Sequence, residues 1–122
     1  MNTMSDLKTI LIVDDEPVNA DVLVAIFKDK YKVKVATSGE KALKIANKSI
    51  PDIVLLDVVM PVMDGHETCR QLLKLSSDIP IILVTGNSSD EDVVKGKEVG
   101  AKDLLAKPVD PDAVIKAVED YI

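Results

Sequence analysis

The sequence predicts a single-domain α/β protein with a parallel sheet of five strands and helices on both faces. Three apolar runs, over residues 10–13, 53–56 and 79–84, lack polar alternation and are therefore typical of strands buried on both faces. Segments with helical spacing of apolar residues lie between these runs. The length of 122 residues fits one domain.

The first strand, over residues 8–13, leads through an acidic loop into a helix. Residues 1–7 are polar and have no period, which predicts a flexible tail in front of a domain over residues 8–122. Pro17 is favoured in the first turn of a helix. The apolar residues that then recur at helical spacing are Val18, Val22 and Ile26, with Leu23 and Phe27 beside them.

The second strand, over residues 32–35, alternates Lys and Val, which is typical of a half-exposed strand at the edge of a sheet. Ser38-Gly39-Glu40 then opens a short helix, and residues 49–52 end it before the central strand. The inner face of this helix is expected to consist of Ala42, Leu43 and Ala46.

The central strand ends at Asp57, and a loop rich in turn residues follows over residues 60–65. The next helix is expected to be buried through Cys69, Leu72 and Leu73. Cys69 is the only cysteine, so no intrachain disulfide can form, and we interpret it as a core residue. His66 has no second His or Cys with which to form a zinc site and is expected to be exposed.

The strand over residues 79–84 ends at Thr85, and Ser88-Ser89-Asp90-Glu91 looks like a capped helix start. This helix is expected to be weak, because a glycine inside a helix, here Gly96, costs about 1 kcal/mol relative to alanine. A last strand over residues 104–106 precedes a helix capped by Asp110, which would be buried through Val114, Val118 and Tyr121 or Ile122.

The charge balance excludes several function classes. The chain has 15 basic and 21 acidic residues, a net charge of −6 and no basic run, so we expect no direct binding of nucleic acid. The apolar runs are too short to span a bilayer, and the N-terminus lacks a signal-peptide pattern. We therefore expect a cytoplasmic protein without a membrane partner.

Polar residues end four of the five predicted strands. The carboxyl ends of parallel strands meet at one edge of the sheet, where open α/β folds bind their ligands. We therefore expect Asp14, Asp15, Asp57, Thr85 and Lys107 to converge.

The residues expected at this edge suit phosphoryl chemistry. Three close carboxylates repel one another unless a cation lies among them, and oxygen ligands without His or Cys favour Mg²⁺. A carboxylate can attack phosphorus and form an acyl phosphate. Mg²⁺, Lys107 and the Thr85 hydroxyl would supply the positive charge and the hydrogen-bond donor that this reaction needs.

The joint motif closely resembles the receiver domain of two-component response regulators. The residues that carry the resemblance are Asp14-Asp15, Asp57 with Met60-Pro61-Val62-Met63-Asp64-Gly65, Thr85, Gly100-Ala101-Lys102-Asp103 and Lys107-Pro108. The resemblance covers the chain from Lys8 onward and implies a flavodoxin-like fold with strand order 2-1-3-4-5.

The resemblance also implies roles for the residues at the edge. Asp57 would accept a phosphoryl group from a sensor histidine kinase or a histidine phosphotransfer protein. Asp15, Asp57 and the backbone carbonyl of Val59 would bind Mg²⁺ directly, and Asp14 would act mostly through bound water.

The remaining roles concern the phosphorylated state. Lys107 would pair with the phosphoryl group, Thr85 would hydrogen-bond it, and Lys107-Pro108 would be a cis peptide. A downstream effector would bind the face formed by the fourth helix, fifth strand and fifth helix. Receivers usually carry an aromatic residue at the position of Leu104, so we hypothesise that the signal travels through movement of the helix around Gly96.

Three other functions fit the residues less well. Phosphohydrolases of similar fold generally carry Asp-x-Asp after the first strand, whereas Asp14 and Asp15 are adjacent here, so we do not expect an enzyme beyond slow self-dephosphorylation. A flavin phosphate would be repelled by Asp14-Asp15-Glu16. The alternative that stays open is a receiver-like interaction module that is not phosphorylated.

Overall fold

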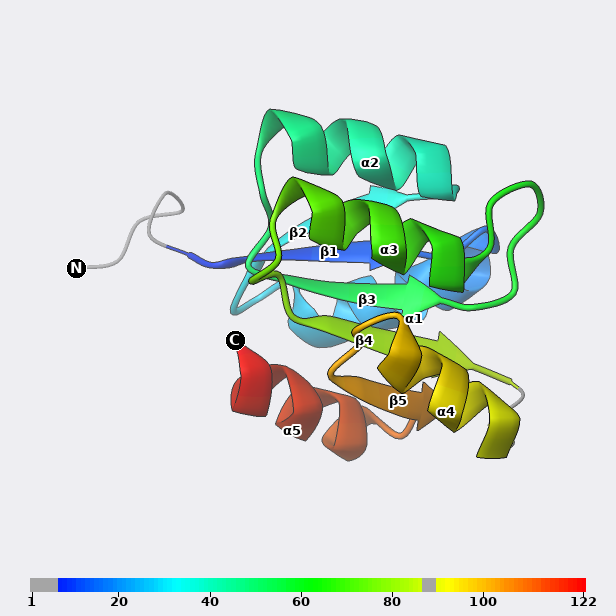
Figure 1. Ribbon diagram of the computed structural model, residues 1–122. Coiled ribbons are helices and arrows are strands. Elements are labelled where there is room, and N and C mark those ends of the chain that lie inside the picture. The colour runs from blue at the N-terminus through cyan, green and yellow to red at the C-terminus, as the bar shows by residue number, and fades with distance from the viewer. Residues whose placement is uncertain (1–6, 87–89) are drawn as a thin grey trace.

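The computed structural model, which describes residues 7–86 and 90–122, contains one parallel sheet in the order β2-β1-β3-β4-β5 (Figure 1). The strands are β1 (Thr9–Val13), β2 (Lys32–Ala36), β3 (Ile53–Asp57), β4 (Ile81–Thr85) and β5 (Asp103–Ala106). The helices are α1 (Pro17–Phe27), α2 (Gly39–Lys48), α3 (Gly65–Leu75), α4 (Asp90–Glu98) and α5 (Pro111–Tyr121). The predicted fold class and strand order are confirmed.

Side chains of the three inner strands alternate between two separate cores. Below α2 and α3, one core contains Leu11, Val13, Val54, Leu56, Ile81 and Leu83. Below α1 and α5, the other contains Ile10, Ile12, Ile53, Leu55 and Ile82. Because both faces of these strands are covered, their sequences are continuously apolar, as the prediction required.

The edge position predicted for the Lys-Val strand is also confirmed. β2 pairs only with β1 in the described sheet, with Lys32 opposite Thr9 and Ala36 opposite Val13. The limits of other strands differ slightly from the prediction. β1 begins at Thr9, one residue later than expected. β4 begins at Ile81, two residues later than expected, where its ladder with β3 starts, because Pro80 has no backbone N–H to donate.

The buried face of α1 differs from the face that the spacing of Val18, Val22 and Ile26 predicted. Ala20, Leu23 and Phe27 are buried, whereas Val18 is 73% exposed and Val22 is 48% exposed. Spacings of three and four residues place Ala20, Leu23 and Phe27 on one face of the helix. Hydrophobicity alone does not distinguish these two stripes of the helix.

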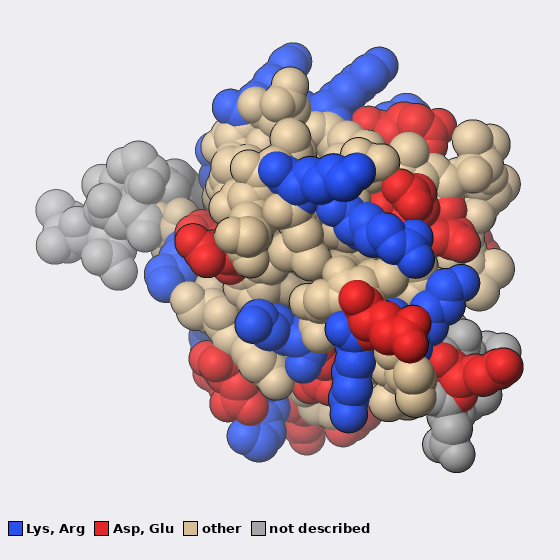
Figure 2. Space-filling view, viewed as in Figure 1, with Lys and Arg blue, Asp and Glu red and all other residues tan. Residues whose placement is uncertain are grey.

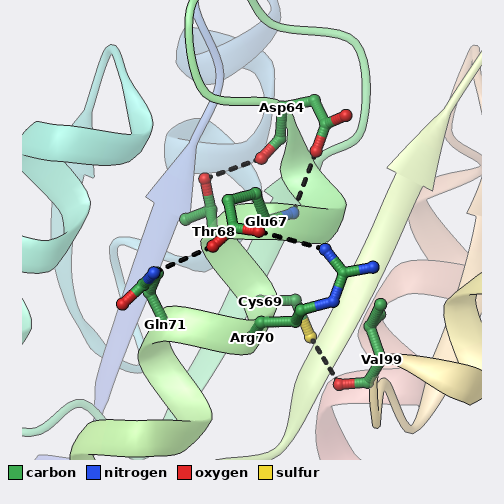
Figure 3. A network of polar contacts seen from close by, with 7 residues as sticks. All are labelled: Asp64, Glu67, Thr68, Cys69, Arg70, Gln71 and Val99. Atoms are coloured by element: carbon green, nitrogen blue, oxygen red, sulfur yellow. Dashed lines mark hydrogen bonds and ion pairs between the residues drawn. The ribbon is translucent and has the colours of Figure 1, made fainter.

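Three helices begin at side-chain caps. Ser38 accepts a hydrogen bond from the backbone nitrogen of Lys41, Asp64 from that of Glu67 and Asp110 from that of Ala113. These bonds satisfy backbone donors that the first helical turn leaves without partners. Figure 3 shows the Asp64 cap at the start of α3. The predicted cap at Asp110 is confirmed, and the helix that Ser38-Gly39-Glu40 was expected to open begins at Gly39.

The predicted start of α4 lies partly outside the described residues, since residues 87–89 are not among them. Within α4, Gly96 is buried, and Val94 is exposed. At the other end of the chain, Val114 and Val118 of α5 are buried as expected, and Ile122, rather than the exposed Tyr121, packs against the core.

Cys69 and His66 both lie inside the molecule. Cys69 is fully buried as predicted, and its thiol lies 3.6 Å from the carbonyl oxygen of Val99 (Figure 3). Burial raises the pKa of this thiol to about 11, so it is not a nucleophile at neutral pH. The prediction of an exposed His66 is wrong, because the second residue of α3 faces inward.

The β3–α3 loop connects Asp57 to α3 and contains one residue with an unusual backbone conformation, Val62. Val62 has a φ of 70°, which is costly for a β-branched residue, and it is 97% exposed. The backbone nitrogen of Gly65 donates a 2.8 Å hydrogen bond to the carbonyl of Val58, so α3 starts directly against the end of β3. This tight closure holds the loop in its conformation.

In the part of the chain that the structure describes, no helix combines the length and apolar character needed to cross a membrane.

We expect Gly65→Ala to lower the free energy of unfolding by roughly 2 kcal/mol, because overpacking a tight site costs this much. The new Cβ would overlap the carbonyl oxygen of Asp57 and press on the backbone of Val58. Urea unfolding followed by circular dichroism measures the change. Gly86→Ala is the matched control, because a Cβ there meets nothing within 4 Å. Equal stabilities of the two variants would contradict the expected crowding at Gly65.

Candidate functional site

The carboxyl ends of four strands bring together the polar residues predicted to converge. Asp14 and Asp15 follow β1, Asp57 and Thr85 end β3 and β4, and Lys107 follows β5. Asp14, Asp57 and Thr85 are buried, and Lys107 is partly buried. Adjacent parallel strands place these residues together although they are far apart in the sequence.

Lys107 forms ion pairs with two carboxylates. Its Nζ lies 3.1 Å from Asp14 Oδ2 and 3.2 Å from Asp57 Oδ1. The other oxygen of Asp14 accepts a 2.9 Å hydrogen bond from the backbone nitrogen of Glu16. The carboxylates of Asp14 and Asp57 are thus both directed toward the Lys107 ammonium group, and this one cation offsets part of the repulsion between them.

Backbone hydrogen bonds fix the strand ends that carry these side chains. The nitrogen of Lys107 donates to the carbonyl of Thr85 at 2.8 Å, and that of Val58 donates to the carbonyl of Val84 at 3.1 Å. Lys107-Pro108 is a cis peptide, as the resemblance implied. The positions of Lys107 and Asp57 are therefore set by the sheet itself.

The environment of Asp57 raises the pKa of its carboxyl group to about 6. The largest cause is burial, since the side chain is only 4% exposed, and the charge of Asp14 adds to it. Lys107 and the backbone nitrogen of Val59, 3.3 Å from Asp57 Oδ1, act in the opposite direction. Asp57 is therefore mostly ionised at neutral pH and becomes protonated in mild acid.

The pKa of Lys107 is raised above its ordinary value. Burial would lower it, but the hydrogen bond to Asp14 and the charges of Asp57 and Asp14 outweigh this effect. Lys107 is therefore a permanent positive charge beside Asp57 at neutral pH.

The three carboxylates fit a hard metal ion. One oxygen from each of Asp14, Asp15 and Asp57 can be chosen so that all lie within 4.8 Å of one another. Oxygen ligands of this kind, without sulfur or imidazole, suit Mg²⁺. The predicted part of the Val59 carbonyl in metal binding stays a prediction.

A small hollow beside the site was not expected from the sequence. It has a volume of about 130 Å³, and Asp14 and Lys107 contribute to it together with Asn19, Val22, Leu23, Val84, Pro108 and Val109. The sequence pattern predicts Val22 as part of the apolar face of α1, so it gives no sign that this residue lines a hollow at the surface. The competing stripe of Ala20, Leu23 and Phe27 was the signal that could have identified Val22 as a surface residue.

Comparisons with known proteins agree on one family. Residues 10–119 match the family described as the response regulator receiver domain. Protein PilH of Pseudomonas aeruginosa is 41% identical over 112 residues, which cover 89% of this chain and 93% of PilH. Transcriptional regulatory protein AfsQ1 of Streptomyces coelicolor is 39% identical over 112 residues, which cover 89% of this chain but 49% of AfsQ1.

A solved structure supports the same relationship. Chemotaxis protein CheY4 of Vibrio cholerae superposes with a TM-score of 0.90 at 31% sequence identity, and the match covers 95% of this chain and 99% of CheY4. The chain spans about half the length of AfsQ1, so the activity of that whole protein does not follow from the match.

We expect Asp57→Asn to stabilise the metal-free protein at pH 7 by roughly 1–3 kcal/mol. Because the pKa of Asp57 is about 6 in the folded protein and ordinarily 3.8, folding binds protons between these values. The stability of the wild type therefore falls as pH rises through this window, and Asn removes that loss. At pH 4 the difference between the two proteins should be much smaller, since Asp57 is then protonated in the folded state and partly protonated in the unfolded state.

Urea unfolding in a chelator at pH 4 and pH 7 measures this difference. Asp29→Asn removes an exposed carboxylate in the turn after α1 and serves as the control, with no such change in pH dependence expected. A loss of stability in Asp57→Asn at pH 7 would show that the ion pair with Lys107 outweighs burial.

Proposed function

The chain belongs to the response regulator receiver domain family, and on this basis we propose that it is a phosphorylation-activated signalling switch with Asp57 as its phosphoacceptor. The observation that carries the proposal is the placement of the buried carboxylate of Asp57 beside Lys107 and two further carboxylates, those of Asp14 and Asp15. The phosphodonor would be a sensor histidine kinase or a histidine phosphotransfer protein. The reaction would take place in the cytoplasm.

The proposed step is a transfer of a phosphoryl group from nitrogen to oxygen. An oxygen of ionised Asp57 attacks phosphorus, the new O–P bond forms as the P–N bond breaks, and the electron pair returns to the imidazole nitrogen. Lys107, already 3.2 Å from Asp57 Oδ1, can pair with the oxygens of the transferred group. The buried Thr85 hydroxyl would then hydrogen-bond the phosphoryl group.

Asp15, Asp57 and the Val59 carbonyl would hold Mg²⁺ in this proposal, with Asp14 acting mostly through bound water. When bound, the ion neutralises charge on the carboxylates and the phosphoryl oxygens. Support for this comes from the close approach of the three carboxylates. Lys107 keeps Asp14 and Asp57 oriented toward one another, which limits the rearrangement that binding requires.

We propose that the output lies on the face formed by α4, β5 and α5. An effector domain or a separate effector protein would read this face, and no direct contact with nucleic acid or membrane is expected. The name of AfsQ1 describes a transcriptional regulator, and this chain corresponds to about half of it, so a DNA-binding effector domain is one candidate. Other relatives, such as PilH, have almost the same length as this chain.

The position of Leu104 supports a relay through α4. A Cβ added to Gly96 would lie 3.1 Å from Leu83 Cδ1 and 3.8 Å from Leu104 Cδ1, so α4 approaches the sheet closely at this glycine. Among the residues of α4 whose burial the structure describes, only Gly96 is buried, and a helix with a central glycine opens more easily than helices that bury several side chains, as α2 and α3 do. We therefore propose that α4 moves on phosphorylation.

The first experiment is mass spectrometry after incubation with acetyl phosphate and Mg²⁺. We expect one added phosphoryl group on the wild type, dependent on Mg²⁺, and none on Asp57→Asn. Asp21→Asn, at an exposed carboxylate of α1, is the control and should gain the group. A folded protein that binds Mg²⁺ but gains no mass would favour the alternative, an interaction module that is not phosphorylated.

The relay predicts a change in amide hydrogen exchange over residues 90–99 when acetyl phosphate and Mg²⁺ are added. The amides of α2 should change little, because this helix is capped at Ser38 and buries Ala42 and Ala46. Equal protection of residues 90–99 with and without phosphorylation would rule out movement of α4 as the relay.

A further inference from the structure

The outer layer formed by α2 and α3 has a charge opposite to that of the whole protein. The chain carries a net charge of −6, yet these two helices together bear five basic and only two acidic side chains. The basic ones are Lys41, Lys44, Lys48, Arg70 and Lys74, and the acidic ones are Glu40 and Glu67. Figure 2 shows blue side chains over this layer with neutral surface between them.

One of the two acidic side chains is already neutralised. Glu67 accepts hydrogen bonds from Arg70 Nη1 at 3.1 Å and from Gln71 Nε2 at 2.8 Å (Figure 3). Among the described residues, Lys44, Lys48 and Lys74 form no ion pair. Their charges are therefore available to a partner.

Helix dipoles explain only part of this pattern. Lys48 and Lys74 lie in the last turns of α2 and α3, where a cation stabilises the helix. Lys44 lies in the middle of α2, where a cation does not have that effect. Lys44 and Lys74 instead share one feature, which is that both line the same groove.

The groove between α2 and α3 has a volume of about 340 Å³ and an apolar part. Leu43, Lys44 and Asn47 line it from α2, and Gln71, Lys74 and Leu75 line it from α3. Leu75 is 41% exposed although it is a large apolar residue. The groove thus combines two leucines with two unpaired cations.

We propose that the α2–α3 groove binds an acidic amphipathic segment of a partner protein. The leucines can contact apolar side chains repeated along one face of that segment, and Lys44 and Lys74 can pair with carboxylates on either side. A nucleic acid fits less well, because a phosphate backbone is bound by clustered Lys and Arg, and the sequence contains no basic run. A flat anionic membrane would contact the lysines but not the groove between them.

The groove is separate from the proposed output face. Figure 1 shows α2 and α3 together at one end of the sheet, beside β2, β1 and β3, while α4 and α5 cover the opposite end. Both surfaces can therefore be occupied at once. The proposal does not depend on phosphorylation of Asp57, so the two can be tested independently.

The test uses a synthetic peptide with Leu at helical spacing and Glu between the leucines, titrated into the ¹⁵N-labelled protein by NMR. We expect amide shifts confined to α2 and α3. The double variant Lys44→Glu/Lys74→Glu should weaken binding at least about tenfold, which corresponds to about 1.4 kcal/mol. Lys30→Glu/Lys116→Glu makes the same change in net charge at exposed residues outside the groove and should stay within about twofold.

Several outcomes would overturn the proposal. These are no shifts in α2 and α3 at millimolar peptide, equal weakening by both double variants, or undiminished binding of a peptide with Ser in place of Leu. Binding of phosphatidylglycerol vesicles in preference to the peptide would assign the groove to a membrane surface. Self-association in analytical ultracentrifugation that the Lys44→Glu/Lys74→Glu variant abolishes would assign the groove to a second copy of the chain. Circular dichroism confirms that each variant is folded before its binding is compared.

Discussion

The two ion pairs of Lys107 are the interaction on which the site depends. Asp14 and Asp57 are both buried and close together, an arrangement that is unfavourable for two negative charges without a cation. Lys107 lies between them and keeps both side chains directed toward the place where Asp15 also contributes an oxygen. The pKa of Asp57 stays raised, chiefly by burial and then by the charge of Asp14, although Lys107 acts in the opposite direction. A further cation among the three carboxylates would favour the ionised form of Asp57.

The rigidity of the sheet makes this arrangement possible. The inner strands are covered on both faces by separate cores, and their apolar side chains are almost completely buried. Charged groups held at the ends of such strands cannot move apart without disturbing that packing. The sheet thus keeps the charged groups of Asp14, Asp57 and Lys107 close together, whereas on a flexible loop like charges would move apart.

The surrounding helices differ in how firmly they are held. α2, α3 and α5 have side-chain caps and bury several residues, whereas α4 carries a central glycine and an exposed valine. This difference is the basis of the proposal that α4 moves on phosphorylation. The α2–α3 layer, with its capped helices, instead offers a surface whose shape is fixed, which suits a preformed groove.

The sequence by itself determined the fold class, the edge strand and the set of polar residues at the strand ends, because these depend on periodicity and on the geometry shared by all parallel sheets. It did not determine which stripe of α1 faces inward, since Val18 and Val22 are as apolar as the buried Leu23. Nor did it show that His66 is buried, because a single polar residue at a helix start has no periodicity to place it. Only the tertiary structure decided these points, together with the groove between α2 and α3, since each depends on how helices pack against a particular sheet. The bridging of Asp14 and Asp57 by Lys107 also became visible only there, because the sequence predicts that strand ends converge but not which atoms meet.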